Sequence, residues 1–97
     1  MAQVKWRARA VADVERLYGF LYEKDGEVAA RAAATILRGA SLLATTPRVG
    51  RPISDGSRRR ELFMPFGSAC YVLRYFVIDS DTVIIIRVWH SRESREQ

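Results

Sequence analysis

Residues 71–90 read YVLRYFVIDSDTVIIIRVWH, and this stretch decides the fold. Two runs rich in β-branched and aromatic residues, Tyr71 to Ile78 and Thr82 to His90, flank the polar segment Asp79-Ser80-Asp81. Strand-forming residues on both sides of a short polar turn are typical of an antiparallel β-hairpin. We therefore expect two paired strands with their turn at Asp79–Asp81.

Alternation along these strands sorts their side chains onto two faces of a sheet. In the first strand, Val72, Arg74 and Phe76 share one face, opposite a face formed by Tyr71, Leu73, Tyr75 and Val77. In the last strand, strict alternation places Ile84, Ile86, Val88 and His90 on one face. The opposite face carries Val83, Ile85, Arg87 and Trp89. Because helices cover only one face, we expect the arginine and aromatic side chains to face a partner. Trp89 is expected to form a surface cluster with Val83 and Ile85.

Upstream of the hairpin, apolar residues recur every three or four positions, which is typical of helices packed on a core. A first helix is predicted at Arg9–Tyr22, with an inner stripe of Val11, Val14, Leu17, Tyr18, Leu21 and Tyr22. A second is predicted at Glu27–Ala44, with an inner stripe of Val28, Ala32, Ile36, Ala40 and Leu43. Lys24-Asp25-Gly26 predicts a tight turn between them in which Gly26 takes a positive φ. Thr45-Thr46-Pro47 ends the second helix, since proline cannot continue its hydrogen bonds.

The segment Arg48–Arg60 contains Gly50, Pro52 and Gly56 and is predicted to be a loop. A strand at Glu61–Met64 follows it, closed by Pro65-Phe66-Gly67, and a further short strand is predicted at Val4–Trp6. The resulting order is β-α-α-β-β-β. This order predicts an α+β fold, with a two-helix antiparallel hairpin on one face of a mostly antiparallel sheet of about four strands. We expect one domain over residues 1–97.

Composition excludes several classes of protein. The chain has 97 residues, of which 48% are hydrophobic, which excludes a disordered chain. Cys70 cannot form an intramolecular disulfide, and with the single histidine it falls short of a metal site, so we expect neither metal nor cofactor. There is no apolar run of membrane-spanning length, and Met1–Trp6 leads directly into structured sequence, so we expect a cytoplasmic protein with no membrane partner. The charged tail Ser91–Gln97 is expected to fray.

The positive charge comes almost entirely from arginine. The net charge is +5, and Lys5 and Lys24 are the only lysines. The planar guanidinium group pairs well with carboxylates and phosphates, so the partner is expected to be either nucleic acid or an acidic protein segment. A mid-strand charge is costly unless paired, so Arg74 and Arg87 are expected either to pair within the domain or to face a partner. The candidate partner-binding residues are Arg58, Arg59, Arg60, Arg74, Phe76, Arg87 and Trp89.

Several short motifs occur in the order and spacing of a known group of proteins. Gly50-Arg51-Pro52, Arg60-Glu61-Leu62, Tyr71-Val72-Leu73-Arg74-Tyr75 and the closing Ile86–Arg92 segment, within this element order, resemble the RelE/ParE toxin superfamily. The resemblance covers nearly the whole chain. It implies the toxin of a bacterial type II toxin–antitoxin system, of the kind that stabilises plasmids, held inactive by a cognate antitoxin. RelE-type toxins cut mRNA on the ribosome, and ParE-type toxins poison DNA gyrase.

The residues at the expected catalytic strand favour the ParE branch. A ribonuclease must bind a phosphate, activate a 2′-hydroxyl and protonate a leaving oxygen. In RelE-type toxins the tyrosine that opens the strand motif is commonly followed by a catalytic arginine, but here Val72 follows Tyr71. We therefore predict a gyrase inhibitor with no catalytic residue.

Two alternatives stay open. The first is a ribosome-dependent mRNA endonuclease that uses Arg74, His90 and Arg92, with His90 as a general acid rather than a strand-end residue bonded to backbone. The second is an inert relative that serves only as a binding module.

Overall fold

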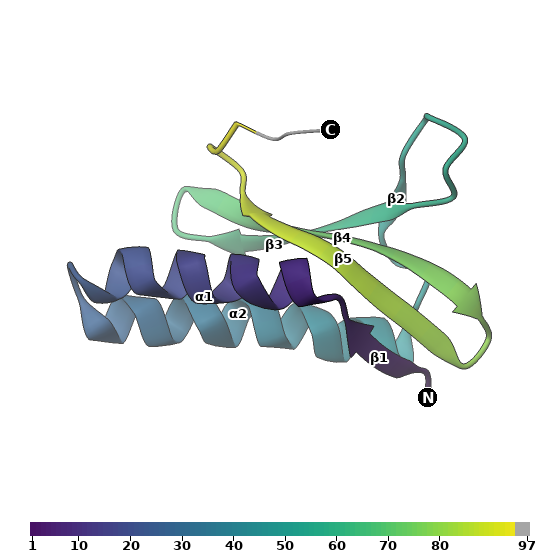
Figure 1. Cartoon of the computed structure of the whole chain (residues 1–97), viewed down its shortest axis with the longest axis horizontal. Coiled ribbons are helices and arrows are strands. Elements are labelled where there is room, and N and C mark those ends of the chain that lie inside the picture. The colour runs from purple at the N-terminus through teal and green to yellow at the C-terminus, as the bar shows by residue number, and fades with distance from the viewer. Residues whose placement is uncertain (95–97) are drawn as a thin grey trace.

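Two helices pack on one face of a five-stranded sheet in the computed structural model, which describes residues 1–94 (Figure 1). The elements in chain order are β1 (Gln3–Trp6), α1 (Ala8–Tyr22), α2 (Gly26–Thr45), β2 (Arg51–Pro52), β3 (Arg60–Phe66), β4 (Ala69–Asp79) and β5 (Thr82–His90). The predicted α+β fold is confirmed, with β2 as one more strand. Of the tail that was expected to fray, residues 95–97 lie outside the described residues.

The sheet has the strand order β1-β5-β4-β3-β2, in which β1 runs parallel to β5 and the other neighbours are antiparallel. The short strand β2 lies in the segment that was predicted to be a loop, and Arg51 pairs with Glu61 there. Gly50 fixes this segment, since its N–H donates a hydrogen bond of 2.8 Å to Tyr75 Oη. A Cβ at Gly50 would lie only 2.5 Å from the same oxygen, so only glycine fits this close approach.

The core lies between the helices and the inner face of the sheet. Helix α2 contributes its predicted stripe, in which Ile36 and Leu43 are fully buried, and they pack in one cluster with Leu73 of β4. The predicted stripe of α1 is only partly right. Leu17 is buried, but Val11, Tyr18 and Tyr22 are exposed, and Ala10 and Asp13 are buried in their place.

The turn between the helices differs from its prediction. Gly26 has no positive φ and forms the first residue of α2. Asp25 takes an extended conformation before the helix, and its side chain accepts hydrogen bonds from the N–H groups of Glu27 and Val28. This N-cap turns the chain without a left-handed residue. Positive φ occurs instead at Gly56, Arg58 and Gly67.

A β-bulge reverses the alternation of β5. Arg74 pairs with Arg87 but Tyr75 pairs with Ile85, so Ile86 is an extra residue in β5. Val83 and Ile85 therefore share the buried inner face with Val88. The predicted surface cluster of Trp89 with Val83 and Ile85 is wrong, because the bulge separates them onto different faces. Arg87 and Trp89 lie on the outer face of the sheet, which is the face away from the helices.

Candidate functional site

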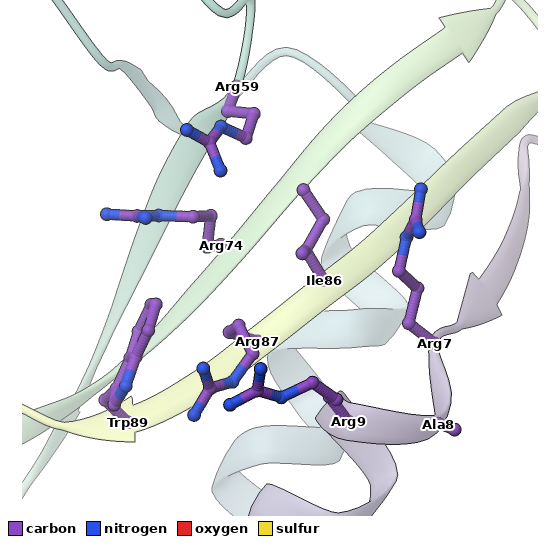
Figure 2. A pocket seen from close by; sticks show the side chains of 8 residues that line it. All are labelled: Arg7, Ala8, Arg9, Arg59, Arg74, Ile86, Arg87 and Trp89. Carbon is purple, nitrogen blue, oxygen red and sulfur yellow. The ribbon is translucent and has the colours of Figure 1, made fainter. Parts of the chain in front are cut away.

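A hollow of about 520 Å³ on the outer face brings five arginines together (Figure 2). We call it the arginine basin, and it is lined by Arg7, Ala8, Arg9, Arg59, Arg74, Ile86, Arg87 and Trp89. Four predicted partner-binding residues, Arg59, Arg74, Arg87 and Trp89, thus meet in one place. Arg7 and Arg9 were not predicted, because they reach the basin only through the path of the chain from β1 into α1.

Arg74, Trp89 and Arg87 form a stack on the floor of this basin. The guanidinium carbons of Arg74 and Arg87 each lie 4.9 Å from the Trp89 ring centroid. Arg74 also donates from Nε and from a terminal nitrogen to one oxygen of Glu61, at 3.0 and 2.8 Å. Both predictions for these arginines meet here, because each is paired within the chain and lies on the outer face. A role in binding a partner stays a prediction.

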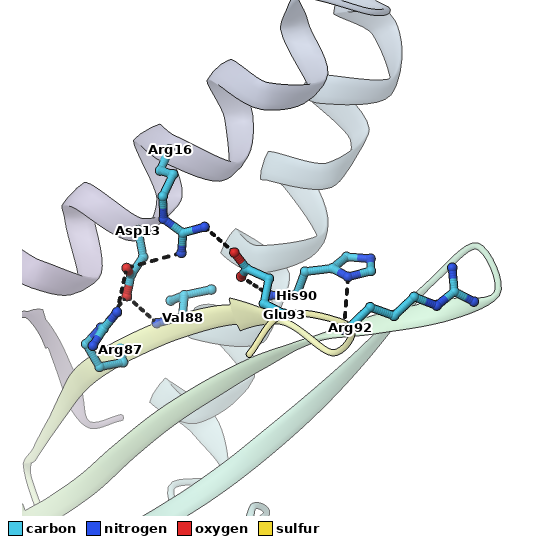
Figure 3. Close-up of polar contacts among 7 residues, drawn as sticks. All are labelled: Asp13, Arg16, Arg87, Val88, His90, Arg92 and Glu93. Carbon is cyan, nitrogen blue, oxygen red and sulfur yellow. Dashed lines mark hydrogen bonds and ion pairs between the residues drawn. The ribbon is translucent and has the colours of Figure 1, made fainter. Parts of the chain in front are cut away.

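Asp13 of α1 binds Arg87, the member of the stack that belongs to β5, and so links α1 to β5 (Figure 3). Its carboxylate, in a residue that is 5% exposed, accepts hydrogen bonds from Arg87 Nε at 2.7 Å and from the Val88 N–H at 2.9 Å. Burial by itself would raise the pKa of Asp13, but the hydrogen bonds from Arg87 and Val88 outweigh it, and the pKa lies below its ordinary value. Val88 follows the part of β5 that pairs with β1, so Asp13 satisfies an N–H on an otherwise open strand edge.

Sequence reasoning missed Asp13. A signal for it exists, because it is an acid on the buried stripe between Ala10 and Leu17. A carboxylate in such a position needs a cationic or N–H partner.

The Arg58–Arg60 run lies beside the basin. A second hollow, of about 320 Å³, is lined by Arg48, Pro52, Arg58, Arg59, Arg60, Val77 and Ile78, and we call it the arginine flank. Arg59 lines both hollows and pairs with Asp55 at 3.3 Å. Arg60 donates to the Arg48 and Gly50 carbonyl oxygens, and Arg58 is exposed. The predicted Phe76 lies beneath Arg7, whose guanidinium carbon is 5.8 Å from its ring centroid.

A third hollow lies on the helix side of the sheet. This apolar cleft of about 560 Å³ is lined by Arg16, Leu17, Phe20, Leu21, Phe66, Tyr71, His90, Arg92 and Glu93. His90 Nδ1 accepts a hydrogen bond of 3.2 Å from the Arg92 N–H. Glu93 pairs with Arg16 and accepts from the His90 N–H at 2.8 Å (Figure 3), which ties the end of β5 to α1. His90 is thus hydrogen-bonded to backbone, as its simpler interpretation predicted.

The three residues named for a ribonuclease are not brought together. His90 and Arg92 line the apolar cleft, whereas Arg74 lines the arginine basin. His90 pairs across the sheet with Tyr71, whose side chain belongs to the inner core, whereas Arg74 lies on the outer face. Val72, at the position of the expected catalytic arginine, is fully buried. The sheet therefore separates Arg74 from His90 and Arg92.

Residues 4–95 match the sequence profile of a family described as the ParE toxin of the type II toxin–antitoxin system parDE. The chain belongs to this ParE toxin family. Two relatives of the toxin in Caulobacter vibrioides nevertheless carry RelE names. Toxin RelE1 is 37% identical over 87 residues, covering 90% of each chain. Toxin RelE3 is 38% identical over 95 residues, covering 98% of this chain and all of the relative.

A solved structure shares the fold of the toxin. It is titled a chromosomal ParDE toxin–antitoxin system from P. aeruginosa, and it matches with a TM-score of 0.76 at 23% identity. The match covers 95% of this chain and 98% of that one. Within residues 1–94, no helix combines the length and apolarity needed to cross a membrane.

Proposed function

We propose that this toxin acts by binding DNA gyrase and that a cognate antitoxin neutralises it. The observation that carries the proposal is the separation of Arg74 from His90 and Arg92 by the sheet. A ribonuclease that used Arg74, His90 and Arg92 would have to place all three around one scissile bond. Val72 offers no replacement cation, and Arg74 is already engaged by Glu61.

The names of the relatives support both branches of the superfamily, so the proposal rests on the positions of the candidate residues. The family and the solved neighbour carry ParE names, and the Caulobacter relatives carry RelE names. A RelE-like mRNA endonuclease is therefore the second candidate. A gyrase inhibitor would act in the cytoplasm, where gyrase and the chromosome are.

The antitoxin is proposed to be an acidic protein whose carboxylates face the arginine basin. The charge of +5 supports such a partner. The apolar cleft, with Phe20 60% exposed at its rim, supplies a surface for apolar anchors of the same protein. In this arrangement one antitoxin chain covers both surfaces.

The test compares two reactions with the same purified protein. Gyrase supercoiling and DNA cleavage are measured on a plasmid, and mRNA cleavage is measured on translating ribosomes. We expect inhibition of gyrase and intact mRNA, with the inhibition relieved by the antitoxin. Ribosome-dependent cleavage that disappears in His90→Ala or Arg74→Ala would establish the endonuclease instead. Activity in neither reaction would indicate an inert binding module.

A further inference from the structure

We propose that the arginine basin and the arginine flank together bind the phosphate backbone of double-stranded DNA. The inference rests on the proposed function, since gyrase holds a DNA duplex that a bound toxin could contact. It names a ligand for this surface that is separate from gyrase and from the antitoxin.

The two hollows concentrate positive charge along one path. Eight arginines line them: Arg7, Arg9, Arg48, Arg58, Arg59, Arg60, Arg74 and Arg87. Three carboxylates pair with members of this set, namely Asp13, Asp55 and Glu61. Within residues 1–94, the guanidinium groups of Arg9, Arg48 and Arg58 make no ion pair. The surface therefore carries an excess of positive charge spread over two adjoining hollows, which suits repeated phosphates better than a single anion.

Arg59 joins the two hollows and has an unused donor. Its terminal nitrogen pairs with Asp55, but its Nε is buried and has no hydrogen-bond partner in the part of the chain that the structure describes. Buried N–H donors are nearly always satisfied, and the Arg59 side chain is 36% exposed, so a shift of this side chain would offer the unused donor to an added acceptor.

The first turn of α1 also opens into the basin, since Ala8 and Arg9 line it. This helix has no side-chain cap and no acidic residue in its first turn, whereas α2 has both, in Asp25 and Glu27. The positive end of the helix dipole at this turn adds to the attraction for an anion.

The aromatic rings of the outer face separate duplex DNA from other partners. Each is covered by a guanidinium group: Phe76 by Arg7, Phe63 by Arg51, and Trp89 by Arg74 and Arg87. Trp89 is only 3% exposed. Single-stranded nucleic acids bind largely by stacking bases on open rings, and peptides bind by burying apolar anchors. The basin offers neither open rings nor apolar pockets, which favours contact with a sugar–phosphate backbone.

The experiment measures binding of a labelled DNA duplex of about three helical turns, roughly 30 base pairs, by fluorescence anisotropy over a range of salt concentrations. The test variant is Arg7→Gln/Arg9→Gln, because both residues are exposed and, within residues 1–94, neither pairs with a carboxylate. The matched control is Arg31→Gln/Arg38→Gln, which removes the same charge from exposed positions on α2. We expect the test variant to bind the duplex at least tenfold more weakly than the wild type. The slope of log K against log salt should become shallower by about 1.8, because each of the two lost phosphate contacts contributes about 0.9. The control is expected to change affinity less than twofold.

Three results would overturn the inference. One is equal loss of affinity in the test and control variants, which would indicate general charge attraction. Another is tighter binding of single-stranded DNA or RNA than of the duplex. The third is that the wild-type protein does not bind the duplex but binds a glutamate-rich peptide, and that this binding depends on Arg7 and Arg9. That result would make the basin a carboxylate site for a protein partner.

Gyrase assays on the same variants separate this inference from the proposed function. Gyrase inhibition by a wild-type protein that does not bind the duplex would contradict the inference and leave the proposed function standing. Duplex binding that depends on Arg7 and Arg9, in a protein that does not inhibit gyrase, would support the inference and contradict the proposed function.

Discussion

Asp13→Asn is expected to destabilise the fold strongly, although the two side chains have the same number of non-hydrogen atoms. The substitution keeps an oxygen that can accept from the Val88 N–H but removes the charge that holds Arg87 and Arg16. Removing one partner of a fully buried ion pair costs about 3 to 5 kcal/mol. The Asp13 side chain is 6% exposed and that of Arg87 is 19% exposed, so solvent reduces this figure. We expect a loss of about 2 to 4 kcal/mol, or about 10 to 25 °C in Tm for a domain of this size.

The pH dependence gives this prediction a second measurement. Because the pKa of Asp13 is lower in the folded protein than its ordinary value, its stabilising effect is fully present above the unfolded pKa of about 3.9. The effect is lost as the pH falls through the folded pKa. The difference in Tm between the wild type and Asp13→Asn should therefore be constant from pH 7 to about pH 5 and shrink below about pH 4.

The assay is thermal unfolding followed by circular dichroism, with Glu15→Gln as the control. Glu15 lies on the same helix, is exposed, and makes no ion pair within residues 1–94. Its substitution removes the same charge at a cost of at most about 0.5 kcal/mol. If Asp13→Asn and Glu15→Gln unfold within about 2 °C of each other, Asp13 does not hold β5 to α1 as described.

Three further substitutions test the packing by thermal or urea unfolding. Ile36→Asp places an unpaired carboxylate in the core, at a site that is 1% exposed, and should unfold the domain. Leu37→Asp, at a site that is 55% exposed, is the control and should leave the domain folded. Equal effects of the two substitutions would mean that the inner stripe of α2 is misassigned. Gly50→Ala should cost about 1 to 3 kcal/mol, since its Cβ would lie 2.5 Å from Tyr75 Oη, and an unchanged midpoint would contradict this contact. Gly19→Ala should instead stabilise by about 0.5 to 1 kcal/mol, because no atom lies within 4 Å of the new methyl group in this helix, and a lower Tm would show that the site is not open.

The sequence predicted the elements that depend on local pattern. Apolar period and turn residues placed α2 within one residue at each end and β5 at its observed bounds. The strand β2 was missed because two residues are too short to show alternation, and Tyr75, which anchors Gly50 next to it, lies 25 positions away. Helix α1 was misoriented because a buried acid looks like a surface residue until its partners Arg87 and Val88 are brought to it.

The candidate site was predictable only in part, for similar reasons. Arg74 and Trp89 were named as candidates from their strand positions, and the structure places both in the basin. The alternation of β5 failed at Ile86 because nothing in a run of valine and isoleucine marks which residue bulges. Arg7 and Arg9 were missed because the basin joins the start of α1 to strands more than 60 residues later, through contacts such as the Arg7 N–H to the Ile85 carbonyl.

The parallel pairing of β1 with β5 has a consequence for synthesis of the protein. Gln3 to Trp6 pair with Thr82 to Ile85, so the strand that lies between β1 and β4 is synthesised after the other strands of the sheet. A nascent chain that ends before Thr82 has both helices but lacks β5, so its β1 and β4 have no shared neighbour. Long-range pairing of this kind forms late, because the loop it closes is long. Folding is therefore delayed until β5 has been synthesised, and chains that terminate before Thr82 contain neither Arg87 nor Trp89 of the basin.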